Sequence, residues 1–448
     1  MDHIVLNAHV GATAVKSHLG RFGRPVGPGL LTRVEPFLEW LDARCAAGTM
    51  PASRVRHGTP APVLMVGDDE SEVQPSLNFA SQDYLGLSEH DAVRGAALEA
   101  LHRFGAHSAG SPTLLGNTVE TVALERDLGE FLWMDRVLLF PSGWAAGFAA
   151  ITALVREPDH VVLDERAHGC LRQGAWAATR NVSVVSHLDL AAVQAALVRI
   201  RERDSRNAIL VVTEGLFPTD SDAPDLTSLQ AVCSAFEATL LVDVAHDLGA
   251  TGPHGLGTIG TSRMLGKLDL VVGSFAKTFA TNGGFVAVRS GAVYQYLKHF
   301  SSPHVASSAL SPMQAATARA ALRLVRSPTG ERARRANAEV SGALRRACSE
   351  RGLQVLGDVS PVVPVVAGSN RVARAAAVLL ARAGVLAGLV EYPTVPPNST
   401  RFRFQVMATH SPAQATLAAV RLADAVAWSR RCVPNSEPAR GGGLTYTT

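Results

Sequence analysis

Short apolar runs alternate with helix-like segments through the middle of the chain, and this alternation constrains the fold more than any other feature. We expect strands at 137–140, 161–163, 181–185, 209–213, 240–242, 268–274 and 285–288. Strands that alternate with helices along a chain usually form a mostly parallel sheet with helices on both faces. The pattern therefore predicts an α/β fold for this part of the chain.

The regions on either side of this alternation have a different character. Upstream, a proline-containing surface connection is expected at 51–75, a short apolar run at 77–80, and helices at 31–47, 91–104 and 119–131. Downstream, helices and short strands of a smaller α+β domain are expected at 315–326, 330–351, 362–366, 401–407 and 412–428. We therefore predict an N-terminal arm and helix (1–75), a large domain (76–305), a small domain (306–430) and a disordered tail (431–448).

Composition excludes several classes of function. The 448 residues are 47% apolar, and 42 Lys and Arg against 39 Asp and Glu give a net charge of +3, too small to argue for nucleic acid. Five cysteines without a CxxC pair favour a reducing compartment and argue against a metal knuckle. We find no signal-peptide pattern and no apolar stretch of membrane-spanning length. We therefore expect a soluble, cytoplasmic protein.

Polar residues follow several of the predicted strands, at the edge of the sheet where ligands of open α/β folds bind. Ser142-Gly143-Trp144 follows the first strand and opens a helix whose free N–H groups suit a phosphate, although Ser142 alone is equally an ordinary N-cap. His168 follows the second strand. It either stacks on an aromatic cofactor ring or is an exposed histidine in a capped turn.

Two further strand ends carry charge. Asp243 ends an all-apolar strand, and His246 comes three residues later. A buried aspartate needs a cationic partner, which a protonated pyridine nitrogen would supply, whereas a metal pair lacks a third convincing ligand. Lys277 follows strand 268–274 and is costly to desolvate unless it is used. One use is a covalent bond to pyridoxal phosphate (PLP), and the alternative is a solvated turn lysine.

Taken together, these motifs resemble the α-oxoamine synthase family of fold-type I PLP-dependent enzymes. The matching stretches occur in family order from Asn78 to His410. They are 78–88 (NFASQDYLGLS), 124–125 (LE), 142–143 (SG), His168, 213–217 (TEGLF), 220–222 (DSD), 242–246 (VDVAH), 274–277 (SFAK), 283–284 (GG), 393–396 (PTVP) and 400–403 (TRFR). The resemblance implies a PLP-dependent transferase with a mostly parallel central sheet, flanking helices and a smaller C-terminal α+β domain.

The resemblance also implies roles at the cofactor ring. Lys277 would carry the cofactor covalently and then act as the proton carrier. Asp243 would pair with the pyridinium nitrogen, His246 would bond the ring oxygen, and His168 would stack on the ring. These four residues form the catalytic set that the resemblance predicts.

Other residues would hold the phosphate and the substrate. Ser274 and the turn Ser142-Gly143-Trp144 would bind the cofactor phosphate. Ser307 and Ser308 would reach the neighbouring subunit's phosphate, which implies a homodimer with shared active sites. Arg403 would bind the amino-acid carboxylate as a bidentate partner, with Arg401 as the nearby alternative, and Gln82 would lie at the substrate rim.

The implied reaction is the decarboxylative condensation of an amino acid with an acyl thioester, carried by CoA or by a separate acyl carrier protein, to give an α-aminoketone. An aminotransferase or an aldolase-like enzyme on the same fold is the alternative within PLP enzymes. A non-catalytic partner subunit is the alternative outside them, and Lys277 counts against it.

The chain departs from the family pattern at four positions around the site. Gln82 replaces a usual asparagine, Thr121 replaces a histidine, Cys170 replaces a serine in the His-Ala-Ser motif, and Pro218 replaces another serine. None of them is the anchoring lysine. We infer an unusual amino-acid or acyl substrate and a role in secondary metabolism.

Overall fold

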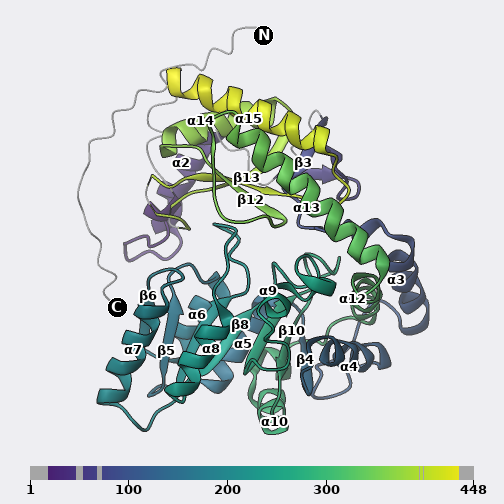
Figure 1. The fold of residues 1–448 in the computed structure, drawn as a ribbon, viewed down its shortest axis with the longest axis vertical. Coiled ribbons are helices and arrows are strands. Elements are labelled where there is room, and N and C mark those ends of the chain that lie inside the picture. Colours follow the sequence, from purple (N-terminus) through teal and green to yellow (C-terminus); the bar gives the residue numbers. More distant parts are fainter. Residues whose placement is uncertain (1–18, 47–53, 68–72, 393, 397, 433–448) are drawn as a thin grey trace.

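A computed structural model describes residues 19–46, 54–67, 73–392, 394–396 and 398–432 (Figure 1). Two seven-stranded sheets organise these residues. In the view of Figure 1 the large sheet and its helices lie below, and the second sheet lies above with α14 and α15 over it. The long helix α13 runs from the upper layer toward α3 and α12.

The large sheet has the strand order β4-β10-β9-β8-β7-β5-β6. Its strands are β4 (Arg136–Phe140), β5 (His160–Asp164), β6 (Val182–Val185), β7 (Ile209–Glu214), β8 (Thr239–Asp243), β9 (Leu270–Ser274) and β10 (Gly284–Val288). Neighbours from β6 to β9 pair in parallel, while β10 is antiparallel to both β9 and β4. The predicted α/β fold with a mostly parallel sheet is therefore confirmed.

Both faces of this sheet are buried because successive strand residues point to opposite faces. Val162, Val211 and Val242 belong to one apolar core, and their neighbours Val161 and Leu241 belong to another. The first core lies under α3 (Asp91–Phe104), α4 (Val119–Leu132), α7 (Leu190–Arg203), α8 (Leu226–Ala235) and α12 (Pro312–Val325). The second lies under α5 (Gly143–Leu154), α6 (Gly169–Ala178) and α10 (Gly291–Phe300).

The second sheet has the order β1-β2-β3-β13-β14-β12-β11. Its strands are β1 (Val55–His57), β2 (Val63–Gly67), β3 (Gln74–Phe79), β11 (Gln354–Val355), β12 (Val362–Val366), β13 (Val385–Val390) and β14 (Arg401–Gln405). Phe402 and Phe404 of β14 pack into a third core with α13 (Pro328–Ser349), α14 (Asn370–Arg382) and α15 (Pro412–Cys432). The alternate residues of β14 therefore point away from that core.

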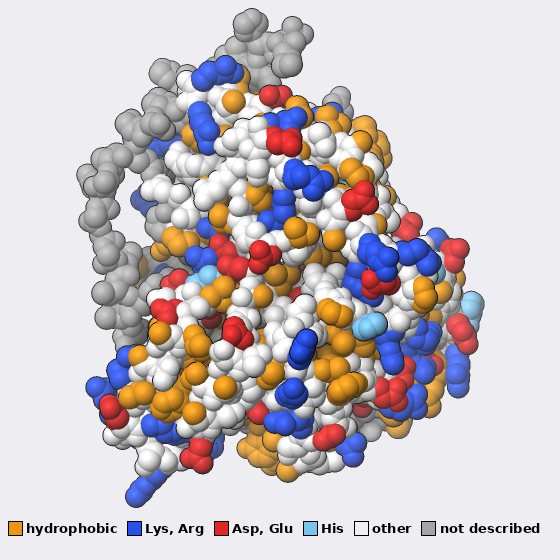
Figure 2. All heavy atoms as spheres, viewed as in Figure 1, with side chains coloured by type: hydrophobic (Ala, Val, Ile, Leu, Met, Phe, Trp, Pro, Cys, Tyr) orange, Lys and Arg blue, Asp and Glu red, His pale blue; other side chains and the backbone are white. Residues whose placement is uncertain are grey.

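The remaining elements are short. They are α2 (Glu35–Ala46), α9 (Gly257–Thr261), α11 (Ser302–Val305) and the 3₁₀ turns η1 (Leu19–Arg21), η2 (Thr32–Val34), η3 (Leu87–Glu89) and η4 (Pro253–Gly255). No helix among the described residues is long and apolar enough to cross a membrane. Figure 2 shows basic and acidic side chains intermixed over the visible face, in keeping with their near balance in the sequence.

Several expectations about the order of elements differ from the structure. The run expected to open the large domain lies in β3, which pairs in parallel with β13 of the second sheet. Segment 51–75 contains the strands β1 and β2, and it is not only a connection. Helix α15 continues to Cys432, so residues 431–432 are helical, while the rest of the expected tail and residues 1–18 lie outside the described ranges.

A loop of the large domain, 217–222, touches the small domain backbone to backbone at Gly357. The N–H of Asp358 donates to the carbonyl of Ser221 at 2.8 Å. Gly357 has a φ of +65°, and an added Cβ would overlap the carbonyl oxygens of Asp220 and Ser221. Only glycine fits this point of contact between the two domains.

Replacing Gly357 with alanine should therefore destabilise the protein, and Gly352→Ala is the matched control. Gly352 has a similar φ of +71° but nothing within 4 Å of an added Cβ. Gly352→Ala should cost about 1 kcal/mol for the left-handed backbone alone. Gly357→Ala should cost about 1–3 kcal/mol more because of the overlap. Denaturant unfolding of the two variants measures the difference. Equal losses in the free energy of unfolding would show that the backbone at Gly357 can move to accommodate the added Cβ.

Candidate active site

Lys277 lies in the turn between β9 and β10, at the carboxyl end of the large sheet. Backbone bonds close this turn: the N–H of Phe275 donates to the carbonyl of Gly283 at 2.9 Å, and the N–H of Thr281 donates to that of Phe275 at 3.2 Å. Burial lowers the pKa of the Lys277 amine, although the nearby carboxylates Asp243 and Glu214 oppose the shift. A larger fraction of the amine is therefore neutral, which is its nucleophilic form.

Two buried carboxyl groups lie beside this lysine. Glu214 and Asp243 are register partners at the ends of the parallel strands β7 and β8. Glu214 accepts the backbone N–H of His168 at 2.7 Å, and Asp243 accepts that of Ala245 at 2.9 Å. Burial raises the pKa of both groups, and the charge of Asp243 raises that of Glu214 further, while Lys277 opposes the rise at Asp243. Lys277 thus favours the ionised form of Asp243, whereas at Glu214 the charge of Asp243 adds to the rise in pKa.

His246 is buried and held from one side. Its Nδ1 lies 2.8 Å from the hydroxyl oxygen of Tyr84, and this hydroxyl donates to Oε1 of Gln405 in β14 at 3.1 Å. Burial lowers the pKa of His246 well below its usual value, so the ring is neutral. Because Nδ1 contacts Tyr84, Nε2 is the nitrogen left to meet a ligand.

His168 is the N-cap of α6, and its ring is exposed. Its Nδ1 accepts the N–H of Cys170 at 3.4 Å and lies 3.0 Å from the Cys170 sulfur. Cys170 itself is buried. The cysteine that replaces the usual serine therefore contacts the Nδ1 edge of the ring and helps to hold it against the helix.

The N-terminus of α5 lies against the end of β9. Ser142 caps the helix by accepting the N–H of Ala145 at 3.1 Å, and an added Cβ on Gly143 would overlap the side chain of Ser274. N–H groups at a helix N-terminus attract phosphate. The Trp144 indole is exposed and stacks on Phe148 at 5.1 Å, so Trp144 offers its backbone rather than its ring.

The two arginines of β14 have different surroundings. Arg401 is buried in an ion pair with Asp220, and it also donates to the carbonyl of Thr219 at 3.2 Å. Arg403 lies close enough to Lys277 and His246 to lower the pKa of both groups. Its Nε is buried with no hydrogen-bond partner in the described part of the chain. Arg403 therefore faces the Lys277 cluster, and Arg401 is already paired.

The remaining predicted residues lie on other segments of the chain. Gln82 is half-buried in the segment between β3 and η3. Ser307 and Ser308 precede Ala309, whose N–H donates to the carbonyl of Gly110 at 2.8 Å, so they lie on the loop at 105–116. Within the described ranges, no set of three His, Cys, Asp or Glu side chains is placed to hold a metal ion.

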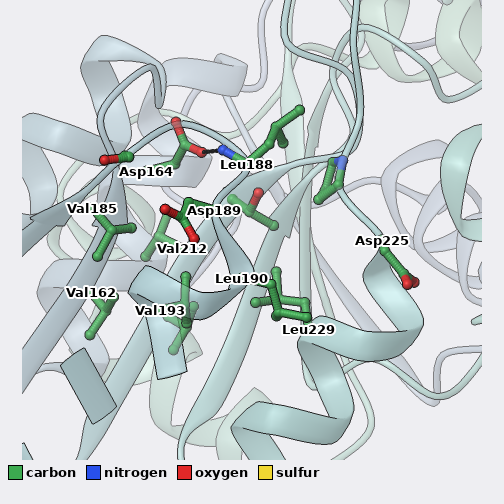
Figure 3. Close-up of a pocket in the computed structure, with 14 residues that line it drawn as sticks. Val162, Asp164, Val185, Leu188, Asp189, Leu190, Val193, Val212, Asp225 and Leu229 are labelled. Carbon is green, nitrogen blue, oxygen red and sulfur yellow. Dashed lines mark hydrogen bonds between the residues drawn. The ribbon is translucent and has the colours of Figure 1, made fainter. Parts of the chain in front are cut away.

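A separate pocket lies between β5, β7, α7 and α8 (Figure 3). Val162, Val193 and Leu229 form its apolar wall. The carboxylates at its mouth already have partners: Asp164 accepts the N–H of Leu188 at 2.9 Å, and Asp189 accepts that of Ala192 at 2.8 Å. Lys277 does not line it, so we assign this pocket no part in the site.

Three residues of the cluster were not predicted: Tyr84, Glu214 and Gln405. Tyr84 lies inside the matched stretch 78–88, and Glu214 directly follows the predicted strand 209–213, next to the strand of Asp243. Their positions in the sequence could therefore have identified both. Gln405 gives no local signal, because its role comes from its contact with Tyr84.

The chain is similar to known proteins of one family. Residues 74–422 match the family model described as aminotransferase class I and II. The chain is 34% identical over 341 residues to 8-amino-7-oxononanoate synthase of Klebsiella pneumoniae, covering 76% of this chain and 87% of the relative. It is 36% identical over 341 residues to the enzyme of the same name from Cellvibrio japonicus, covering 75% of this chain and 83% of the relative.

The fold has close neighbours among solved structures. Serine palmitoyltransferase of Sphingomonas wittichii superposes with a TM-score of 0.83 at 24% identity, covering 90% of this chain and 99% of that one. The family match spans most of the chain, and the curated relatives are covered over most of their length. The chain therefore belongs to the aminotransferase class I and II family, as a PLP-dependent acyltransferase of the α-oxoamine synthase group.

Proposed function

We propose that this protein condenses an amino acid with an acyl thioester and releases thiol and carbon dioxide to give an α-aminoketone. The observation that carries the proposal is the convergence of Lys277, Asp243, His246 and Arg403 in one buried cluster at the strand ends. Relatives named 8-amino-7-oxononanoate synthase support it. Both CoA and carrier-protein thioesters fit the proposal, as does a role in secondary metabolism in the cytoplasm.

The donor set fits PLP. Lys277 would hold it covalently, Asp243 would face the ring nitrogen, and the exposed face of His168 would stack on the ring. His246 would meet the ring oxygen through Nε2, and the N–H groups after Ser142, with Ser274, would hold the phosphate. When bound, PLP supplies an electron-accepting ring that stabilises negative charge on the amino-acid α-carbon.

The protein's own residues then divide the work. Arg403 would hold the substrate carboxylate through two parallel N–H bonds and so orient the α-carbon. Lys277, kept partly neutral by burial, would take the α-proton on Nζ and later return it. Asp243 would remain ionised and hold a proton on the ring nitrogen. Ser307 and Ser308 fit a homodimer in which they reach the second site.

The function is tested by supplying the PLP-loaded protein with each of the common amino acids and following the absorbance of the cofactor. Responding amino acids are then combined with acyl-CoA and acyl-carrier-protein thioesters of several chain lengths. We expect free thiol and carbon dioxide in equal amounts. Formation of a 2-oxo acid without thiol would instead identify an aminotransferase and overturn the proposal.

Lys277→Ala should abolish thiol and carbon dioxide release, because the variant lacks the amine that anchors PLP and moves the α-proton. Lys267→Ala is the matched control, since Lys267 is an exposed lysine of the same domain. Borohydride reduction followed by peptide mass mapping should place PLP on residue 277 in wild type and in the control. A reducible covalent link that survives in Lys277→Ala would refute the assignment.

Gly284→Ala should weaken PLP binding by displacing the phosphate site. An added Cβ would lie 2.5 Å from Cα of Gly143 and 2.7 Å from the carbonyl oxygen of Ser142, and backbone atoms cannot rotate away. We expect at least about a tenfold loss of PLP affinity, equivalent to about 1.4 kcal/mol. Gly291→Ala, with nothing within 4 Å of its Cβ, should bind PLP normally. Equilibrium dialysis compares the two, and equal affinities would remove Gly284 from the site.

Arg403→Ala should raise the amino-acid KM about ten- to a hundredfold and lower kcat less, because a charge-assisted carboxylate contact is worth roughly 1.5–3 kcal/mol of binding. Arg403→Lys should recover only part of the loss, since lysine cannot form the parallel pair of bonds. Steady-state kinetics measures both. An unchanged KM in Arg403→Ala would mean that another residue holds the carboxylate.

A further inference from the structure

Strand β14 presents three polar side chains on one face. Arg401, Arg403 and Gln405 alternate with Phe402 and Phe404, and the two phenylalanines pack into the small-domain core. Residues at i, i+2 and i+4 of a strand share a face. The three polar side chains therefore point together toward the large domain.

The first of the three is fixed by a large-domain carboxylate. Arg401 pairs with one oxygen of Asp220, and Arg166, also from the large domain, pairs with the other. The Thr219 hydroxyl donates to the same carboxylate at 2.8 Å. Burial works against ionisation of Asp220, but Arg401, Thr219 and Arg166 together outweigh it and keep its pKa below the usual value. The pair is thus a buried, fully supported contact between the domains.

The third side chain is also fixed from the large-domain side of the site. Gln405 is buried and accepts the hydroxyl of Tyr84 at 3.1 Å, and Tyr84 contacts His246. Between these two anchored positions lies Arg403, whose register partners on the neighbouring strands are Gly388 of β13 and Pro364 of β12. Arg403 therefore lies on the strand between two residues that are held by other parts of the protein. Its Nε has no hydrogen-bond partner among the described residues.

We propose that Arg401 and Asp220 are positioning residues for the substrate carboxylate: their ion pair, with the Gln405–Tyr84 contact, sets where Arg403 stands relative to Lys277. This inference rests on the proposed function, which gives Arg403 the carboxylate. Asp220 occupies Arg401, so Arg401 cannot compete for the substrate. The same ion pair prevents β14 from sliding or tilting at the site.

The loop that carries Asp220 is rigid enough to serve as a reference point. Ser221 has a φ of +62°, and its hydroxyl donates to the carbonyl of Asp358 at 2.9 Å and accepts from Arg345 at 2.9 Å. At its end, Asp222 lies 3.2 Å from Nε2 of His187. Each side of the loop is thus held by a different element.

The test compares Arg401→Gln and Asp220→Asn with Arg345→Gln. Arg345 is a matched control because it reaches the same loop from the small domain but lies on α13 rather than on β14. The probes are two amino acids and the amines that lack only their carboxylates. L-alanine is compared with ethylamine, and L-serine is compared with ethanolamine. Cofactor absorbance reports binding of all four, and equilibrium dialysis reports PLP affinity.

Arg401→Gln and Asp220→Asn should weaken binding of the amino acids about tenfold, while the amines and PLP bind within twofold of wild type. Arg345→Gln should leave the ratio of amino-acid affinity to amine affinity unchanged. In an Arg403→Ala background, Arg401→Gln should have no further effect on amino-acid binding, because the residue that it positions is gone. Arg401→Lys should recover part of the loss.

Two results would overturn the inference. One is an equal loss for amines and amino acids, which would mean that the ion pair only stabilises the junction of the domains. The other is full additivity with Arg403→Ala. If wild type responds to no amino acid at all, the proposed function fails and this inference fails with it. A wild type that responds, combined with either of the first two results, rejects the inference alone.

Discussion

Charge compensation at the buried carboxyl end of the large sheet is the constraint on which the rest of the site depends. Asp243 ends a strand whose side chains are almost fully buried, and an isolated carboxylate there would be costly. Lys277 supplies the opposite charge from the next strand of the sheet, and burial lowers its own pKa in return. Each charge lowers the cost of burying the other.

This compensation is possible because the strands are parallel. Neighbouring parallel strands end at the same edge, so the register of β7 and β8 brings Glu214 and Asp243 together, and the turn after β9 adds Lys277 at that edge. The second sheet then closes the site from above with the polar face of β14. A single chain can therefore place a lysine, a carboxylate and an arginine together, although they lie far apart in sequence.

Sequence reasoning located the residues whose position is set locally. Lys277, Asp243 and His168 each follow an apolar strand, so strand order alone places them at the ligand-binding edge. It assigned the carboxylate to Arg403 and kept Arg401 as the alternative. Residues two apart on a strand share a face, so the tertiary partner Asp220 is what distinguishes them.

Sheet membership could not be predicted for the same reason. The pairing of β3 with β13 joins distant parts of the chain, and neither strand carries a mark of its partner. Gln405 is a similar case, since its place in the site depends on Tyr84.

The departures from the family pattern take on physical meaning in this setting. Thr121 caps α4 together with Thr118, so its hydroxyl serves the helix. The Cys170 sulfur contacts Nδ1 of His168, and this contact helps to hold the ring in place without the usual serine. Pro218 offers no hydroxyl, and the neighbouring Thr219 hydroxyl is committed to Asp220, so it does not replace the missing serine at the cofactor. Under the proposed arrangement, this loop would act on the reaction through Asp220 and β14 rather than through direct contact with PLP.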